Sequence, residues 1–153
     1  MKHYRDESNK IYAYESDGSQ DAFIKEGLVP ISDEDLAAMM APTTEQLLRQ
    51  LTAARKEQER QGVVINGVRY AGDPSNRQAL QEAIAFMDYA GRTEFESWKD
   101  SDNQFHASHP LVDVVDAYQA IGARRAELIA TEGEYAARIT SGTFTDLSLV
   151  TWP

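Results

Sequence analysis

Apolar residues recur along the chain at two spacings, every second residue in short stretches and every third or fourth residue in longer ones. The clearest alternation surrounds Asn66-Gly67, a dipeptide typical of two-residue β-hairpin turns because both residues tolerate a positive φ. Val63 before this turn and Tyr70 after it fall on one face of the predicted hairpin. Similar patterns predict two further hairpins, over residues 3–14 and 93–107.

Longer stretches with apolar residues at three-and-four spacing predict helices over residues 33–40, 44–61, 74–90 and within 108–139. Ser32 and Asp73 are suited to cap two of these helices, since their side-chain oxygens can accept hydrogen bonds from the first-turn N–H groups. Gly122 and Gly133 lie within the last helix. Each costs about 1 kcal/mol relative to alanine and can interrupt that helix.

The helix predicted over residues 44–61 changes character along its length. Its apolar stripe consists of Leu47, Leu48, Leu51 and Ala54, after which charged residues dominate. Such a helix can bury only its first half, so we expect the second half to be solvated or to act as a spacer between two lobes.

These patterns predict an α+β fold with a definite order of elements. We expect a small N-terminal hairpin and short helix over residues 1–41, and a connector helix over 42–61. A domain with the order β-hairpin, helix, β-hairpin and long helix follows over 62–140. An apolar tail, expected to dock on a partner, completes the chain over 141–153.

Composition narrows the classes of function. The chain has no cysteine, which excludes disulfides, thiolate nucleophiles and cysteine-ligated metal. A net charge of −10 argues against binding nucleic acid or anionic lipid. The sequence has no apolar run long enough to cross a membrane, and its N-terminus lacks the apolar segment of a secretory signal. We therefore expect no membrane partner and a cytoplasmic site of synthesis.

One group of residues could hold a metal ion. His106 and His109 lie close in sequence, and Asp113 and Asp116 follow at helical spacing. The simpler interpretation is that His109 precedes the helix near its cap, while the aspartates interact with the helix dipole in its first turns. We therefore expect neither a metal nor a cofactor here, although a small metal-dependent hydrolase centred on His106, His109 and Asp113 stays an alternative.

Other catalytic patterns are absent. The sequence contains no Gly-x-Ser-x-Gly elbow and no phosphate-binding glycine loop, because its glycines lack the required spacing. We expect a protein that is not an enzyme.

Apolar residues in the long helix and the tail suggest a surface for another protein. A free C-terminal end with this many apolar side chains would be unusual in water. The residues that we expect to bind a partner are Leu128, Tyr135, Ile139, Phe144, Leu147, Leu149 and Trp152.

The sequence also resembles a family. The stretch "VVINGVRYAGD", the helix start "SNRQALQEA" and the hairpin "FESWKDSDNQFH" resemble a C-terminal domain of unknown function found in bacteriophage and prophage tail proteins. This resemblance covers about residues 60 to 140. The N-terminal stretch from "YRDESNKIYAY" to "ISDEDLAAM" is similar to the leader segment of tail-fibre assembly proteins.

The resemblance implies a phage tail-associated protein without known catalysis or known functional residues. Two roles fit it: a chaperone for tail-fibre assembly, or an accessory component of the virion tail or fibre. Its partners would be a tail-fibre or baseplate protein, or further copies of itself. It would act in the host bacterial cytoplasm during assembly and, in the second role, stay in the virion tail. A further alternative is an early phage protein that binds and inhibits a host factor.

Overall fold

The computed structural model describes residues 1–153 and confirms the α+β class. The chain divides into two compact units, Met1–Thr43 and Thr44–Pro153. We call them the N-terminal unit and the helical unit. The division falls two residues after the boundary that we expected at residue 41.

The N-terminal unit contains a three-stranded antiparallel sheet and one short helix. Strands β1 (Lys2–Arg5) and β2 (Ile11–Tyr14) form the predicted hairpin, and β3 (Val29–Ile31) pairs with the other edge of β1, giving the order β2-β1-β3. A short 3-10 turn, η1 (Asp21–Phe23), lies between β2 and β3. Helix α1 (Asp33–Met40) begins after Ser32, whose Oγ accepts a hydrogen bond from the Asp35 N–H at 3.0 Å.

The sequence did not predict β3. Its central residue is Pro30, which cannot donate a backbone hydrogen bond and therefore argues against a strand in most positions. A proline is tolerated here because β3 lies at an edge of the sheet, where one side of the strand has no neighbour.

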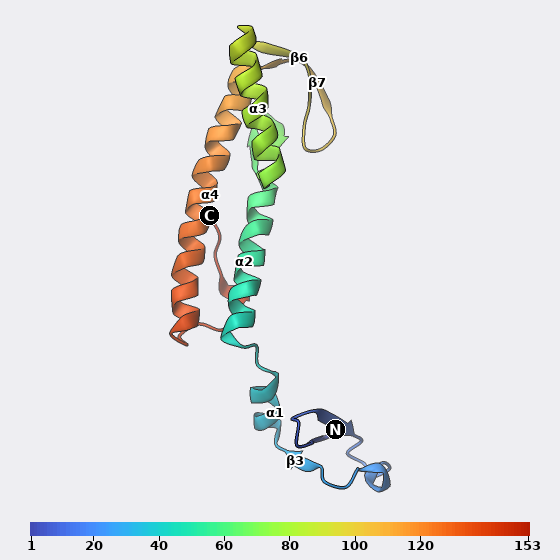
Figure 1. Ribbon diagram of the computed structural model, residues 1–153. Helices are drawn as coiled ribbons and strands as arrows, with labels where there is room; N and C mark the ends of the chain where they lie inside the picture. Colours follow the sequence, from blue (N-terminus) through green and yellow to red (C-terminus); the bar gives the residue numbers. More distant parts are fainter. The chain divides into compact units, whose positions relative to one another are not determined.

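The helical unit is built around two antiparallel helix contacts. Helix α4 (Leu111–Thr140) packs against α2 (Thr44–Gln61) along one half of its length and against α3 (Pro74–Ala90) along the other (Figure 1). Two hairpins connect these helices: β4 (Val63–Ile65) with β5 (Val68–Tyr70), and β6 (Glu94–Lys99) with β7 (Phe105–Pro110). A final 3-10 turn, η2 (Leu147–Leu149), contacts α2.

Local signals place these elements as the sequence predicts. Asn66 and Gly67 both have positive φ, at 50° and 82°, as the tight turn between β4 and β5 requires. Asp73 caps α3 by accepting hydrogen bonds from the Ser75 and Asn76 N–H groups at 3.1 and 3.2 Å. Gly91 ends α3 with φ of 62°.

Helix α4 is continuous for 30 residues and is not interrupted by either glycine. Its length is about 45 Å at 1.5 Å per residue. A side chain at Gly122 or Gly133 would meet no other atom within 4 Å. The two glycines are therefore not needed to let another part of this chain approach.

Two separate apolar cores hold the helical unit together. The first lies among α3, α4 and the two hairpins, and its buried members are Val68, Tyr70, Leu80, Val114, Ala117 and Ile121. The second lies where the C-terminal segment covers the α2–α4 pair, and its buried members are Leu47, Leu51, Ile139 and Phe144. No helix of the chain combines the length and apolar character needed to cross a membrane.

The second half of α2 is not the solvated spacer that we expected. The helix belongs to the helical unit and packs along α4, and Glu59 near its C-terminal end is buried. Arg55 and Glu59 of this half instead pair with residues of α3 and α4, as described below. The exposed Glu57 and Arg60 pair with each other.

Candidate functional site

Hairpin β6–β7 brings the predicted site residues His106 and His109 to the same side of the sheet. Residues three apart on a regular strand point to opposite faces, so this arrangement needs a break in the alternation. Ser108 supplies it, since its φ of 50° departs from strand geometry. His109 is thereby turned inward and is only 4% exposed.

His109 is enclosed by aromatic side chains. The Tyr70 hydroxyl lies 2.5 Å from His109 Nε2, and the Trp98 ring stacks on the imidazole with a centroid separation of 5.6 Å. Burial lowers the pKa of His109, against the opposing effect of the Asp113 charge. Burial also raises the pKa of Tyr70 to about 12. His109 is therefore a neutral core residue in the folded protein near pH 7.

The three candidate metal ligands each have a different partner. His106 Nε2 lies 2.9 Å from the Asp100 carboxylate, and Asp113 accepts a hydrogen bond from the Asn66 amide at 3.1 Å. His109, as above, contacts Tyr70. No group of three or more histidine, aspartate or glutamate side chains in the chain is arranged to hold an ion. The rings of His106 and His109 thus lie near each other, with centroids 5.8 Å apart, but these two histidines and Asp113 do not form such a group.

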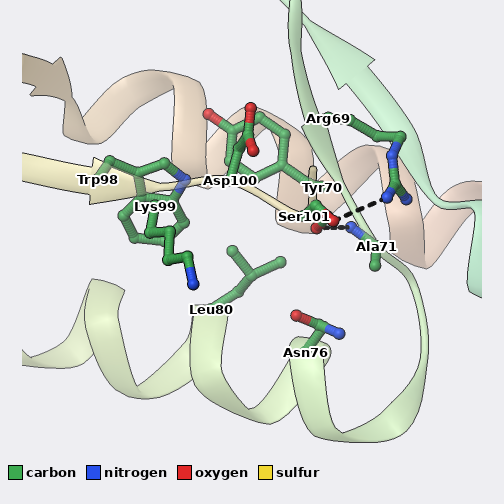
Figure 2. Close-up of a pocket in the computed structure, with 9 residues that line it drawn as sticks. All are labelled: Arg69, Tyr70, Ala71, Asn76, Leu80, Trp98, Lys99, Asp100 and Ser101. Carbon is green, nitrogen blue, oxygen red and sulfur yellow. Dashed lines mark hydrogen bonds between the residues drawn. The ribbon is translucent and has the colours of Figure 1, made fainter. Parts of the chain in front are cut away.

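A small polar cavity of about 60 Å³ lies between hairpin β6–β7 and the start of α3 (Figure 2). Its floor is Leu80, and Trp98, Lys99, Asn76 and Asp100 border it. The Trp98 Nε1 atom is buried there without a hydrogen-bond partner in the chain. The cavity can hold a few water molecules but is much smaller than the roughly 300 Å³ of a typical ligand pocket.

The turn of hairpin β6–β7 is tied to strand β5 beside this cavity. Arg69 donates hydrogen bonds to the Asp102 carboxylate at 2.7 and 2.8 Å and to the Ser101 carbonyl at 2.9 Å. Ser101 Oγ accepts a hydrogen bond from the Ala71 N–H at 2.7 Å (Figure 2). These polar groups are occupied in holding the two hairpins together.

A charge cluster around the buried Glu59 joins the three long helices. Its members are Arg55, Glu59, Arg77, Arg125 and Glu132. Glu59 contacts Arg55 on its own helix, Arg77 of α3 at 3.5 Å and Arg125 of α4 at 3.2 Å. Arg55 also pairs with Glu132 of α4. The Glu59 carboxylate is thus surrounded by guanidinium groups, which compensate for its loss of hydration.

The sequence analysis did not predict this charge cluster. Two glycines next to it, Gly62 and Gly72, allow the close backbone contact that forms beside Glu59. A side chain at Gly62 would lie 1.8 Å from the Tyr70 carbonyl oxygen, and one at Gly72 would lie 2.3 Å from the Glu59 carbonyl oxygen. The chain entering β4 and the chain leaving β5 therefore cross in close contact at the end of α2. This crossing places the start of α3 beside Glu59.

The predicted partner-binding residues lie mostly inside the helical unit. Leu128, Ile139 and Phe144 are buried, and Tyr135, Leu147 and Trp152 pack on the second apolar core. These side chains are used within this chain, because the tail covers the α2–α4 pair. Leu149, at 64% exposed, is the predicted residue that stays in solvent. A role of this set in binding a separate protein stays a prediction.

Cation–π contacts hold the tail in place. The Arg138 guanidinium lies 4.6 Å from the Phe144 ring centroid and 5.0 Å from that of Tyr135, and the two rings are 4.9 Å apart. Arg138 therefore covers the aromatic pair through which the tail joins α4.

Large apolar side chains are exposed elsewhere. On α3, Phe86 is 60% exposed and Tyr89 is 92% exposed, and the two lie one turn apart. We call them the α3 aromatic pair. In the N-terminal unit, Phe23 is 74% exposed and Met40 is 69% exposed. Sequence periodicity did not single out any of these residues.

Comparison with known proteins gives one match. A family model described as a domain of unknown function (DUF4376) matches residues 42–150, which covers α2 through η2. No curated protein matches the chain. No solved structure matches it either.

Proposed function

The chain belongs to the DUF4376 family of domains of unknown function, and we propose that it is a non-enzymatic phage tail-associated protein. It acts by binding other proteins of the tail. The sequence resemblance of about residues 60 to 140 to phage tail proteins supports the tail assignment.

The observation that carries the proposal is the α3 aromatic pair. Tyr89 and Phe86 expose two aromatic rings to solvent on one helix. Aromatic residues are enriched where proteins bind each other, so this pair is suited to contact a partner. The two candidate histidines make contacts within the chain, His109 with Tyr70 and His106 with Asp100. The exposed aromatic pair is therefore the feature of the helical unit that best supports a binding role.

The proposal leaves two roles, assembly chaperone or virion component. A chaperone would raise the yield of assembled fibre and be missing from purified virions. A virion component would be detected in purified particles by mass spectrometry. Both roles require a direct complex with a tail-fibre or baseplate protein.

The test is co-expression of the full chain with the tail-fibre and baseplate proteins of the genome that encodes it, followed by affinity capture. The double variant Phe86→Ser, Tyr89→Ser should reduce recovery of the partner by at least about tenfold, as expected for the loss of interface aromatics. Phe105→Ser is the matched control, because Phe105 is an aromatic residue on β7, outside the pair, and its exposure of 73% lies between those of Phe86 and Tyr89. Equal recovery with both variants, or no complex with any tail protein, would refute the proposal.

A further inference from the structure

The N-terminal unit has no interior of its own. None of residues 1–43 is buried, whereas the helical unit contains two cores of buried side chains. Units of about 40 residues fold alone only with help from disulfides, metals or association, since they bury too little apolar surface. This unit contains no cysteine and no metal cluster. Its sheet and helix therefore lack the usual means of stabilisation within the unit itself.

The apolar residues of this unit face solvent on several elements. Phe23 projects from η1, Val29 from β3 and Met40 from the end of α1, and each is more than half exposed. On the sheet, Tyr4 lies directly across from Tyr12, and its ring contacts Tyr14 edge-on at 5.7 Å. These tyrosines are only half-buried. The unit thus has the apolar side chains for a core, but its own elements do not cover them.

The unit is also strongly acidic. It contains four lysines and arginines and nine aspartates and glutamates, so its net charge is 4 − 9 = −5, half of the total of −10. Three of the acids, Asp33, Glu34 and Asp35, lie together in the first turn of α1. Glu7 and Glu26 border an open groove of about 410 Å³ beside Tyr12 and Leu28. Lys25 also lines this groove, so the excess of acids belongs to the unit as a whole and not to every apolar residue's immediate surroundings.

We propose that the N-terminal unit is completed by docking onto a basic, partly apolar surface of a partner protein. A second copy is a poor partner, because it would bring another −5 charge to the same contact, where charges closer than about 10 Å repel each other. Nucleic acid is excluded by the same sign of charge. This inference rests on the proposed function, which supplies the partner as a tail protein.

Coupling of folding to docking follows from these features. A segment that gains its core only from a partner uses part of the binding free energy to become ordered. The free chain should therefore hold α2, α3 and α4 firmly while the strands of the N-terminal unit open frequently. Binding should stabilise those strands and leave the helical core nearly unchanged.

The first test is hydrogen–deuterium exchange of the full chain alone, read by mass spectrometry. Amides of β1 and β2 should exchange at least about a hundredfold faster than core amides of α4, as expected for a locally unstable unit. Protection of β1 and β2 equal to that of α4 would overturn the inference, since the unit would then be stable without a partner.

The second test adds the tail-fibre or baseplate protein captured in the co-expression experiment. Its binding should slow exchange in β1 and β2 by at least about tenfold. The affinity should fall as salt is raised. Phe23→Ser and the charge reversal Glu7→Lys, Glu26→Lys should each weaken binding by at least about tenfold. Val64→Ser, at a similarly exposed apolar residue of the helical unit, should leave binding unchanged.

The outcomes separate this inference from the proposed function. A complex that forms while β1 and β2 stay unprotected, or that is insensitive to the Phe23 and charge variants, overturns the inference and leaves the proposed function standing. No complex with any tail protein contradicts both.

Discussion

The charge cluster around Glu59 gives the sharpest test of how the helical unit is held together. Glu59→Gln keeps the shape of the side chain and removes the negative charge that Arg55, Arg77 and Arg125 contact. Removing one partner of a buried ion pair typically costs 3–5 kcal/mol, because the remaining charges are left uncompensated. The side chains of Arg77 and Arg125 are 24% and 44% exposed, so water screens part of this cost. We expect a loss of about 3 kcal/mol, at the low end of that range.

Urea unfolding followed by tryptophan fluorescence measures this loss. The chain has two tryptophans, Trp98 and Trp152, and both belong to the helical unit, so the signal reports that unit. With a urea dependence of about 1.5 kcal/mol per molar, the midpoint should fall by about 2 M. The denaturant slope should not change.

Glu57→Gln is the matched control. It makes the same change two residues earlier on α2, where the exposed Glu57 pairs with Arg60 at 2.6 Å. Exposed pairs contribute between 0 and about 1 kcal/mol, so the control should shift the midpoint by less than about 0.7 M. If the two variants lost the same stability, the Glu59 cluster would not be the connection between helices that we describe.

Three further predictions concern the same unit. Gly72→Ala should destabilise the fold by several kcal/mol, because the new methyl group would lie 2.3 Å from a backbone oxygen. Gly133→Ala should stabilise the fold by up to about 1 kcal/mol, because its methyl group meets no other atom within 4 Å. The two variants should therefore shift the melting temperature in opposite directions. Phe144→Ala should cost about 3 kcal/mol and Leu149→Ala nearly nothing by urea unfolding, and equal values would mean that the tail is not docked. The buried His109 resists protonation while the unfolded chain accepts a proton near pH 6.5, so stability should be highest above that pH and fall as the pH drops below it. His109→Gln should reduce the difference between urea midpoints at pH 7.5 and 5.5, and an unchanged difference would show that His109 is not responsible.

Short-range signals allowed much of the fold to be predicted. Asn66-Gly67, Asp73 and Gly91 act through the backbone geometry of their own neighbourhood, and each lies where its preference predicts. The order of hairpins and helices in the helical unit follows from them. The sequence alone could not predict that α4 continues through Gly122 and Gly133, because packing decides whether a glycine ends a helix.

Long-range pairing could not be read in the same way. Arg55, Glu59 and Glu132 appear along the chain as ordinary charges on helix surfaces, and only the packing of α2 on α4 brings them together. The apolar tail had the same ambiguity. Its composition indicated that Phe144 is covered, but not that the covering surface belongs to the same chain.

The candidate site was predicted least well. The helical spacing of His109, Asp113 and Asp116 suggested a shared face that His106 could approach. His109 instead lies in β7, before the helix, and is buried against Tyr70 and Trp98. The exposed residues on which our proposals depend, Tyr89 and Phe23, carry no periodic signal. They stand out only once the burial of every other residue is known.

The central claim is that this chain works by binding another tail protein through its exposed surfaces. Light scattering coupled to size-exclusion chromatography, on the full chain mixed with a purified tail-fibre protein of the genome that encodes it, tests the claim most directly. We predict one peak that contains both proteins in a fixed ratio and that separates again at high salt. Two independent peaks at low salt, with both proteins folded, would contradict the account.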